Sequence, residues 1–157
     1  MAVSIFARIG TIQGESQDDK HKDEIEVLSW SWGLSQSGTI LHGGGGGRAS
    51  FQDLNFTHKL DKASPILMTA CATGEHIKDA TITVRKAGKD EQEYLVIEMT
   101  DVLVTSVSTS GSEGDTPMES VALAFAMVDL EYTPQKSDGS LDAGVHFTYD
   151  LKANRKG

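Results

Sequence analysis

Two long stretches of this chain alternate apolar and polar residues, and both change the apolar register partway along. Within residues 94–104 the apolar positions are first Leu95, Ile97 and Met99, and then Val102 and Val104. Within residues 119–132 they are first Val121, Leu123, Phe125 and Met127, and then Val128, Leu130 and Tyr132. Period-two alternation predicts β-strands, and a parity change inside a strand indicates a bulge or a change of sheet. The pattern predicts an all-β protein whose long strands turn the corners of a barrel.

Shorter patterns complete this architecture. Residues 80–85 alternate and are separated from 94–104 by a turn-like segment, so the two predict a hairpin. Residues 145–151 alternate again as a last strand. One helix is expected, with Ser64 as N-cap, Pro65 in the first turn and Gly74 as its stop. We expect a single domain over residues 1–157, a two-sheet β-barrel with one helix packed against it, and an extended Gly-rich loop at about 38–50.

The charge of the chain excludes several classes of partner. The formal net charge is −9 over 157 residues, which disfavours both nucleic acid and anionic membrane surfaces. No apolar run approaches the ~20 residues that span a bilayer, so membrane insertion is not expected. The N-terminal residues lack the basic and apolar segments of a secretory signal. The single cysteine, Cys71, cannot form an internal disulfide.

No motif predicts catalysis. The run of five glycines at residues 43–47 lacks the following Lys-Ser/Thr pair of a phosphate loop. The five histidines show no metal-ligand spacing, and His21 sits in a charged run interpreted as a solvated loop. Residues 138–144 lack the alternating acids of a calcium loop, and the hydroxyl-rich run 105–110 contains no nucleophile elbow. We therefore expect no enzymatic activity, no metal and no cofactor.

The most informative segment is residues 28–37, Leu-Ser-Trp-Ser-Trp-Gly-Leu-Ser-Gln-Ser. In a strand its large residues would share one buried face: Leu28, Trp30, Trp32 and Leu34. The opposite face would be small and uncharged, which is unusual because exposed strands normally carry Lys or Glu. An ordinary half-exposed strand is one interpretation. A channel wall or a packed interface is the other.

Four segments, taken in order, resemble the haemolysin-coregulated protein family, which forms the tube of type VI secretion systems. They are GESQDDKHKDEIEVLSWSWG (14–33), FTHKLDKASPILMTACATGEHI (56–77), ATITVRKAGKDEQEYLVIEMTDVLVTSVS (80–108), and the strand 121–132 with the Pro-Gln-Lys that follows at 134–136. The resemblance covers nearly the whole chain. It departs at residues 110–115, which are more acidic here than is typical of the family.

The resemblance implies a function as well as a fold. It implies a homohexameric ring that stacks into a tube, a spike protein at the tube tip, a contractile sheath around it, and small effector proteins in the lumen. It also implies assembly in the bacterial cytoplasm and secretion by the machine itself, to the outside or into a target cell, without a cleaved signal. Some relatives carry a toxin domain after the barrel, and none is expected after residue 151. The alternatives are a monomeric β-barrel that binds a small ligand and a hydrolase with an unrecognised triad.

Two sets of site residues follow. The alternation places four small residues on one face, and its smoothness together with the resemblance assigns that face to the channel wall, in contact with effectors: Ser29, Ser31, Gly33 and Ser35. The Gly-rich segment is expected to reach from one ring to the next and to order on stacking. Its residues are Leu41, His42, Gly43, Gly44, Gly45, Gly46, Gly47 and Arg48.

Overall fold

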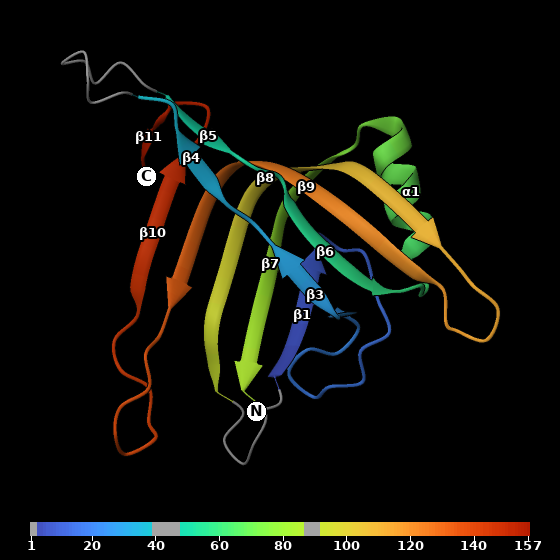
Figure 1. Ribbon diagram of the computed structural model, residues 1–157, viewed down its shortest axis with the longest axis horizontal. Helices are drawn as coiled ribbons and strands as arrows, with labels where there is room; N and C mark the ends of the chain where they lie inside the picture. The colour runs from blue at the N-terminus through green and yellow to red at the C-terminus, as the bar shows by residue number, and fades with distance from the viewer. Residues whose placement is uncertain (1–2, 39–47, 87–91) are drawn as a thin grey trace.

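The computed structural model describes residues 3–38, 48–86 and 92–157, and these ranges contain eleven strands and one helix (Figure 1). The strands of the first half are β1 (Val3–Ile9), β2 (Ile25–Val27), β3 (Ser29–Ser31), β4 (Leu34–Gln36), β5 (Ala49–Phe51) and β6 (Leu54–Lys59). The helix α1 (Ser64–Thr73) precedes β7 (His76–Lys86), β8 (Glu93–Ser110), β9 (Met118–Tyr132), β10 (Val145–Asp150) and β11 (Arg155–Lys156).

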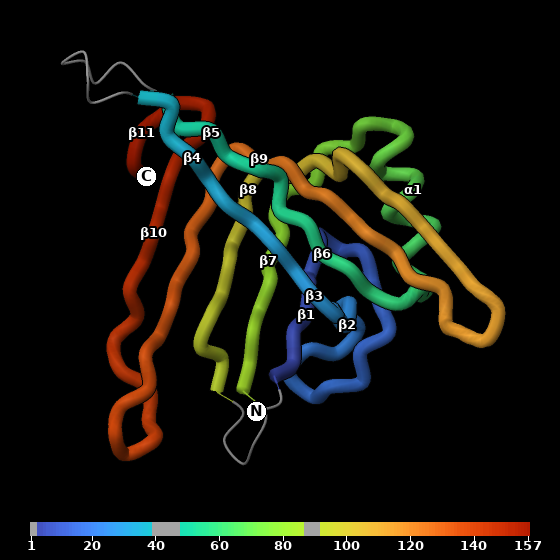
Figure 2. Tube along the Cα trace, viewed as in Figure 1, coloured from blue at the N-terminus to red at the C-terminus, as the bar shows by residue number. Residues whose placement is uncertain are grey.

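All strand pairs are antiparallel, and the main sheet closes on itself. Its order is β11-β10-β9-β8-β7-β1-β2, and β9 also pairs with β6, which pairs with β3. Because β2 and β3 are consecutive in the chain, residues 25–31 pair first with β1 and then with β6. That double pairing closes a barrel, with α1 against it and β10 extending to one side (Figure 2). The predicted all-β barrel with one helix is confirmed.

The parity changes in β8 and β9 are confirmed as changes in burial. In β8 the core residues are Ile97 and Met99 before the change, and Val102 and Val104 after it. Asp101 lies between them with φ 54°, a left-handed conformation that reorients the side chains on either side. A register shift against β9 follows between residues 104 and 106. In β9 the change falls slightly earlier than predicted, since Phe125 and Ala126 are buried and Met127 is exposed.

The helix has the predicted end but a different start. Pro65 lies in its first turn, and Gly74 closes it with φ 66° while Glu75 N–H donates to the Ala70 carbonyl. Ser64 is not the N-cap as predicted, because it is the first helical residue and is buried. The N-cap is Ala63, whose side chain has no atom that can accept a hydrogen bond. Asp61 serves this end instead, because its Oδ1 accepts the Ala63 N–H at 2.9 Å.

The charged run at residues 18–24 is not the solvated loop that the sequence predicted. Asp18 accepts two hydrogen bonds from Arg85 of β7, one of them at 2.9 Å from Nη1. This pair holds the pKa of Asp18 far below its usual range. His21 is buried, stacks on Phe6 at 4.4 Å and lies 2.6 Å from Glu93 Oε1. The run therefore covers the outward side of β1 and β7, which a local charge count cannot reveal.

Candidate functional site

Ser29 and Ser31 lie on β3 with both side chains exposed. β3 pairs with β6, and the Ser29 hydroxyl is 2.6 Å from the hydroxyl of Thr57, its register partner. Ser31 pairs in the same way with Asn55. Ser29 and Ser31 are thus exposed on the outside of the barrel. The exposed surface that they form continues onto the neighbouring strand β6.

The same surface extends across two more strands by register. Thr57 pairs with Ser120 of β9, which pairs with Ser108 of β8. Asn55 pairs with Ala122, which pairs with Ser106. Two parallel rows of small side chains therefore cross β3, β6, β9 and β8. We call this surface the small-polar face: Ser29, Ser31, Asn55, Thr57, Ser106, Ser108, Ser120 and Ala122.

The small-polar face carries no charge, and charged residues appear only at its borders. Six of its eight members are exposed; Thr57 is partly buried and Ala122 is buried. Asp53 borders it at one end, where its Oδ2 accepts a hydrogen bond from Thr105 Oγ1 at 2.6 Å. Lys59 borders it at the other end, in register with Met118. The surface therefore offers hydroxyl and amide groups that donate and accept hydrogen bonds, without long charged side chains.

Six members of this face were missed by the sequence analysis. They come from β6, β8 and β9 and span residues 55 to 122, so no local window contains them together. The hydroxyl-rich run 105–110 was the one available signal, and it was considered only for catalysis. Its serines at 106 and 108 become part of the face because β8 pairs with β9 along this stretch.

The other two predicted residues of this set lie elsewhere. The strand breaks at Trp32–Gly33, and Ser35 belongs to the separate two-stranded sheet of β4 and β5, opposite Ser50. Gly33 lies at the break, with its carbonyl accepting the Gln52 N–H. The predicted buried face of large residues is also wrong at its ends, because Leu28 is 49% and Leu34 50% exposed. A continuous strand over residues 28–37 would have been needed to align all of them.

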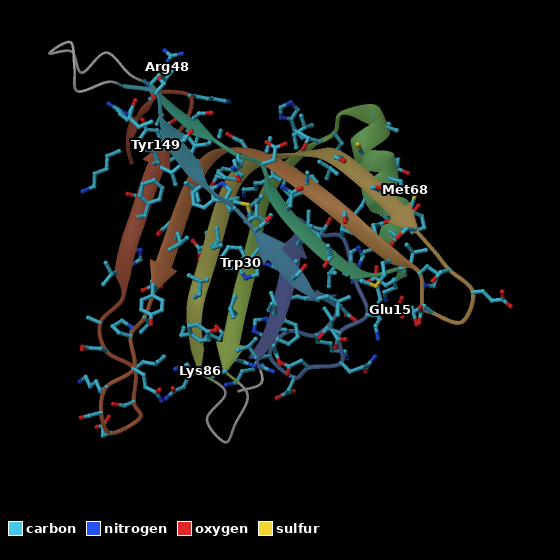
Figure 3. The ribbon with its side chains drawn as sticks, in the orientation of Figure 1. Glu15, Trp30, Arg48, Met68, Lys86 and Tyr149 are labelled. Carbon is cyan, nitrogen blue, oxygen red and sulfur yellow. The ribbon has the colours of Figure 1, made fainter. Side chains whose placement is uncertain are left out.

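The two tryptophans are partly buried against the core rather than lining a cavity. Trp30 packs toward the centre of the barrel (Figure 3). Trp32 lies about 6 Å from the rings of Phe51, Phe125 and Phe147, so it joins β5, β9 and β10 through aromatic contacts. Their apolar side chains hold this segment against the core, and the serines of β3 lie on the opposite, outward side.

A buried ion pair lies directly behind the small-polar face. His58 of β6 and Glu119 of β9 are register partners, both at most 1% exposed, with Nε2 and Oε1 2.8 Å apart. The other ring nitrogen, Nδ1, lies 3.7 Å from Asp61 Oδ2. Burial lowers the pKa of His58, but the nearby carboxylates of Asp61 and Glu119 raise it more, so the net pKa lies above 6.5.

The outward surface of the other half of the sheet is charged. One cross-strand row runs Arg8, Thr81, Glu98, Asp129 and Thr148 across β1, β7, β8, β9 and β10. Arg8 also pairs with Asp79 at 3.0 Å. His146 lies 2.8 Å from Asp129 Oδ1 and 3.2 Å from Glu131 Oε2, and the hydrogen bond to Asp129 chiefly raises its pKa. We call this the charged face: Arg8, Asp79, Glu98, Asp129, Glu131 and His146.

Most of the predicted ring-stacking segment lies outside the described residues, namely positions 41–47. Arg48 is described and exposed (Figure 3), at the end of the ribbon formed by β4 and β5. Its N–H donates to Ser37 Oγ at 3.2 Å, which joins the two arms where the ribbon ends. The stacking role of this segment stays a prediction.

Residues 3–38, 48–86 and 92–157 contain no group of three His, Cys, Asp or Glu side chains suited to a metal ion. Within the same ranges no helix is long and apolar enough to cross a membrane.

Comparison with known proteins gives the family. The family model described as "Type VI secretion system effector, Hcp" matches residues 6–132. Protein hcp1 of Pseudomonas aeruginosa strain PAO1 is 50% identical over 159 residues, with 98% of each chain covered. The crystal structure of Hcp1 from Salmonella typhimurium is 43% identical with a TM-score of 0.84, covering 100% of both chains. A solved type six secretion system protein is 30% identical with a TM-score of 0.92, covering 99% of this chain and 100% of that one. The chain therefore belongs to the Hcp family and is a structural tube protein of a type VI secretion system.

Proposed function

We propose that six copies of this chain form a ring whose central channel is lined by the small-polar face, and that stacked rings carry effector proteins inside. Membership of the Hcp family supports self-assembly into rings and secretion by the type VI system. In this proposal a spike protein tips the tube, a contractile sheath surrounds it, and the tube passes from the bacterial cytoplasm to the outside or a target cell.

The observation that carries the proposal is the extent of the small-polar face. Two rows of small uncharged side chains span four strands in a chain with a net charge of −9. A channel wall without long charged side chains leaves the bore open. Its hydroxyls can also hydrogen-bond to varied cargo without demanding one fixed charge pattern. The charged face has neither property.

The test compares arginine substitutions on the small-polar face with one elsewhere on the outward side of β8. Ser31→Arg and Ser108→Arg introduce the same side chain on β3 and β8, and both should still form rings while retaining much less effector in a pull-down. Thr100→Arg is the matched control, because Thr100 is exposed on the outward side of β8 but away from the small-polar face. It should retain effector normally. Equal loss in all three variants would contradict the assignment.

Labelling locates the face independently of cargo. In a Cys71→Ala background, Ser31→Cys should react with a small maleimide in assembled rings but not with a maleimide reagent wider than the channel. Thr100→Cys should react with both. Equal labelling of Ser31→Cys by the two reagents would place this face outside the channel, and failure to form rings would place it in a subunit interface.

The Gly-rich segment receives its own test. We propose that residues 41–48 contact the next ring, because glycines let a backbone lie close to a neighbour and Arg48 can meet an acidic edge of an acidic protein. Deleting residues 43–47 should leave single rings intact and reduce tube formation and secretion. Normal secretion by the deletion variant, or loss of the ring itself, would overturn this role.

A further inference from the structure

A groove with a volume of about 710 Å³ lies between α1, the start of β7 and the chain that follows β1. Its apolar lining is formed by Ile9, Ile12, Ile66 and Ile77. Ile66 is 52% exposed, although it lies on a helix that packs against the barrel core. An isoleucine this exposed at the rim of an apolar groove has apolar surface that a binding partner can bury.

The groove also contains an open strand edge. β7 is in register with β8 from His76, but its register with β1 begins only at Ala80. Between these points Gly10 N–H donates to the Asp79 carbonyl, and the chain then turns away at Gly10, whose φ is +54°. Among the described residues, His76 and Ile77 of β7 therefore have a register partner on one side only, in β8. Such an edge can accept one further strand.

The charge at the groove differs from that of the whole protein. Lys62 and Lys78 lie along it, with Glu75 as the acidic residue of its lining, so these side chains sum to +1. The whole chain has a net charge of −9. Lysines beside an open strand edge favour a partner segment that brings carboxylates.

The groove lies on the side of the sheet opposite the small-polar face. Leu67 and Ala70 of α1 belong to the core cluster, whereas Ser106 and Ser108 of β8 face outward. α1 therefore packs on the inner surface of the strands whose outer surface is small and polar. If that surface lines the channel, as proposed above, the groove opens to the outside of the tube.

We infer that this groove binds an extended acidic segment of a partner protein outside the tube. The segment would add as a strand to β7 at residues 76–78, place an apolar side chain against Ile66, and set carboxylates beside Lys62 and Lys78. Alternation of side chains along an added strand would send every second residue into the groove. The outward orientation, and only that part, rests on the proposed function.

The experiment uses a synthetic seven-residue peptide that alternates Asp or Glu with Val or Ile, labelled for fluorescence polarisation. It should bind the full-length protein, and a peptide with Lys in place of the acidic residues should not. Lys62→Glu and Lys78→Glu should each weaken binding roughly tenfold, while Lys22→Glu and Lys152→Glu on other surfaces should not. Ile66→Ser should weaken it several-fold; Met68→Ser, also exposed on α1 but outside the groove lining, is its matched control.

Backbone pairing is tested separately. N-methylating alternate peptide amides removes donors and should abolish binding, and amide exchange at residues 76–78 should slow when the unmodified peptide binds. Absence of binding, binding of both peptides alike, or protection elsewhere would overturn the inference. An acidic peptide that binds as a helix, insensitive to methylation, would overturn the strand mode. Binding to the free protein but not to assembled rings would leave the groove in place and refute the outward orientation, and with it the proposed channel assignment.

Discussion

The small-polar face and the charged face occupy the outward side of the same two strands. β8 carries Glu98 in its first half and Ser106 and Ser108 in its second, and β9 carries Ser120 first and Asp129 later. The two strands stay paired in both regions, on either side of the register shift near residue 105, so the strands themselves do not require either choice. The difference teaches that the needs of β-structure do not determine the outward residues, and in the proposed assembly the two halves of the barrel meet different surroundings.

The contrast reverses beneath the surface. Behind the small-polar face lies the buried pair of His58 and Glu119, whereas behind the charged face lie apolar residues such as Ile82, Ile97 and Val128. A neutral surface thus covers one buried charged pair set among apolar residues such as Phe56 and Val121, and a charged surface covers an apolar core. Substitutions on and beneath each face separate what these layers do.

The largest effect is expected from breaking the buried pair. His58→Ala leaves the Glu119 carboxylate buried without its cation, which should lower the free energy of unfolding by about 3–5 kcal/mol. Chemical denaturation of the purified protein measures it. The control is the double variant His58→Leu with Glu119→Leu, which removes both charges and should recover most of the loss. A cost below about 1 kcal/mol for His58→Ala would mean that the pair contributes little.

The same pair predicts a pH dependence. Because the folded-state pKa of His58 lies above 6.5, its contribution is fully present below pH 6.5 and is lost as the pH rises through the raised pKa. The wild-type protein should therefore lose free energy of unfolding on the alkaline side relative to the double Leu variant. Denaturation midpoints between about pH 5 and 9 would show it, and parallel curves for the two proteins would contradict it.

The smallest effect is expected on the charged face, where Glu98 and Asp129 are direct cross-strand neighbours of like charge. Glu98→Lys should replace repulsion by attraction and raise the free energy of unfolding by roughly 0.2–1 kcal/mol. Ser108→Lys, on the same strand but in the small-polar face, has Ser120 opposite it and should change stability by no more than about 0.5 kcal/mol. A stabilising effect of equal size in both would mean that cross-strand charge is not its source.

Local patterns predicted the elements of this fold well. Parity changes predicted the turning strands because buried side chains repeat at every second residue of a regular strand. In β8 two features depart from a regular strand, the left-handed conformation of Asp101 and the register shift near residue 105. Pro65 and Gly74 delimited the helix for similarly local reasons. The start of the helix was misassigned, because Asp61 supplies the side-chain acceptor there and Ser64 is already helical.

The candidate site was predicted only in part, because its residues are joined by pairing between distant strands. Ser29 and Ser31 stood out locally, but their neighbours Thr57, Ser120 and Ser108 lie 28 to 91 positions from Ser29 along the chain and carry no shared motif. The pairs His58–Glu119 and Asp18–Arg85 were missed for the same reason, being separated by 61 and 67 residues.

The length of the β8–β9 ladder has a mechanical consequence. Fourteen register pairs join the two strands through both faces. A force that slides one strand past the other would load these hydrogen bonds together, whereas a force that peels the strands from one end would load them one after another. A tube built from such subunits should resist tension directed along β8 and β9 far better than tearing that begins at the 111–117 loop between them.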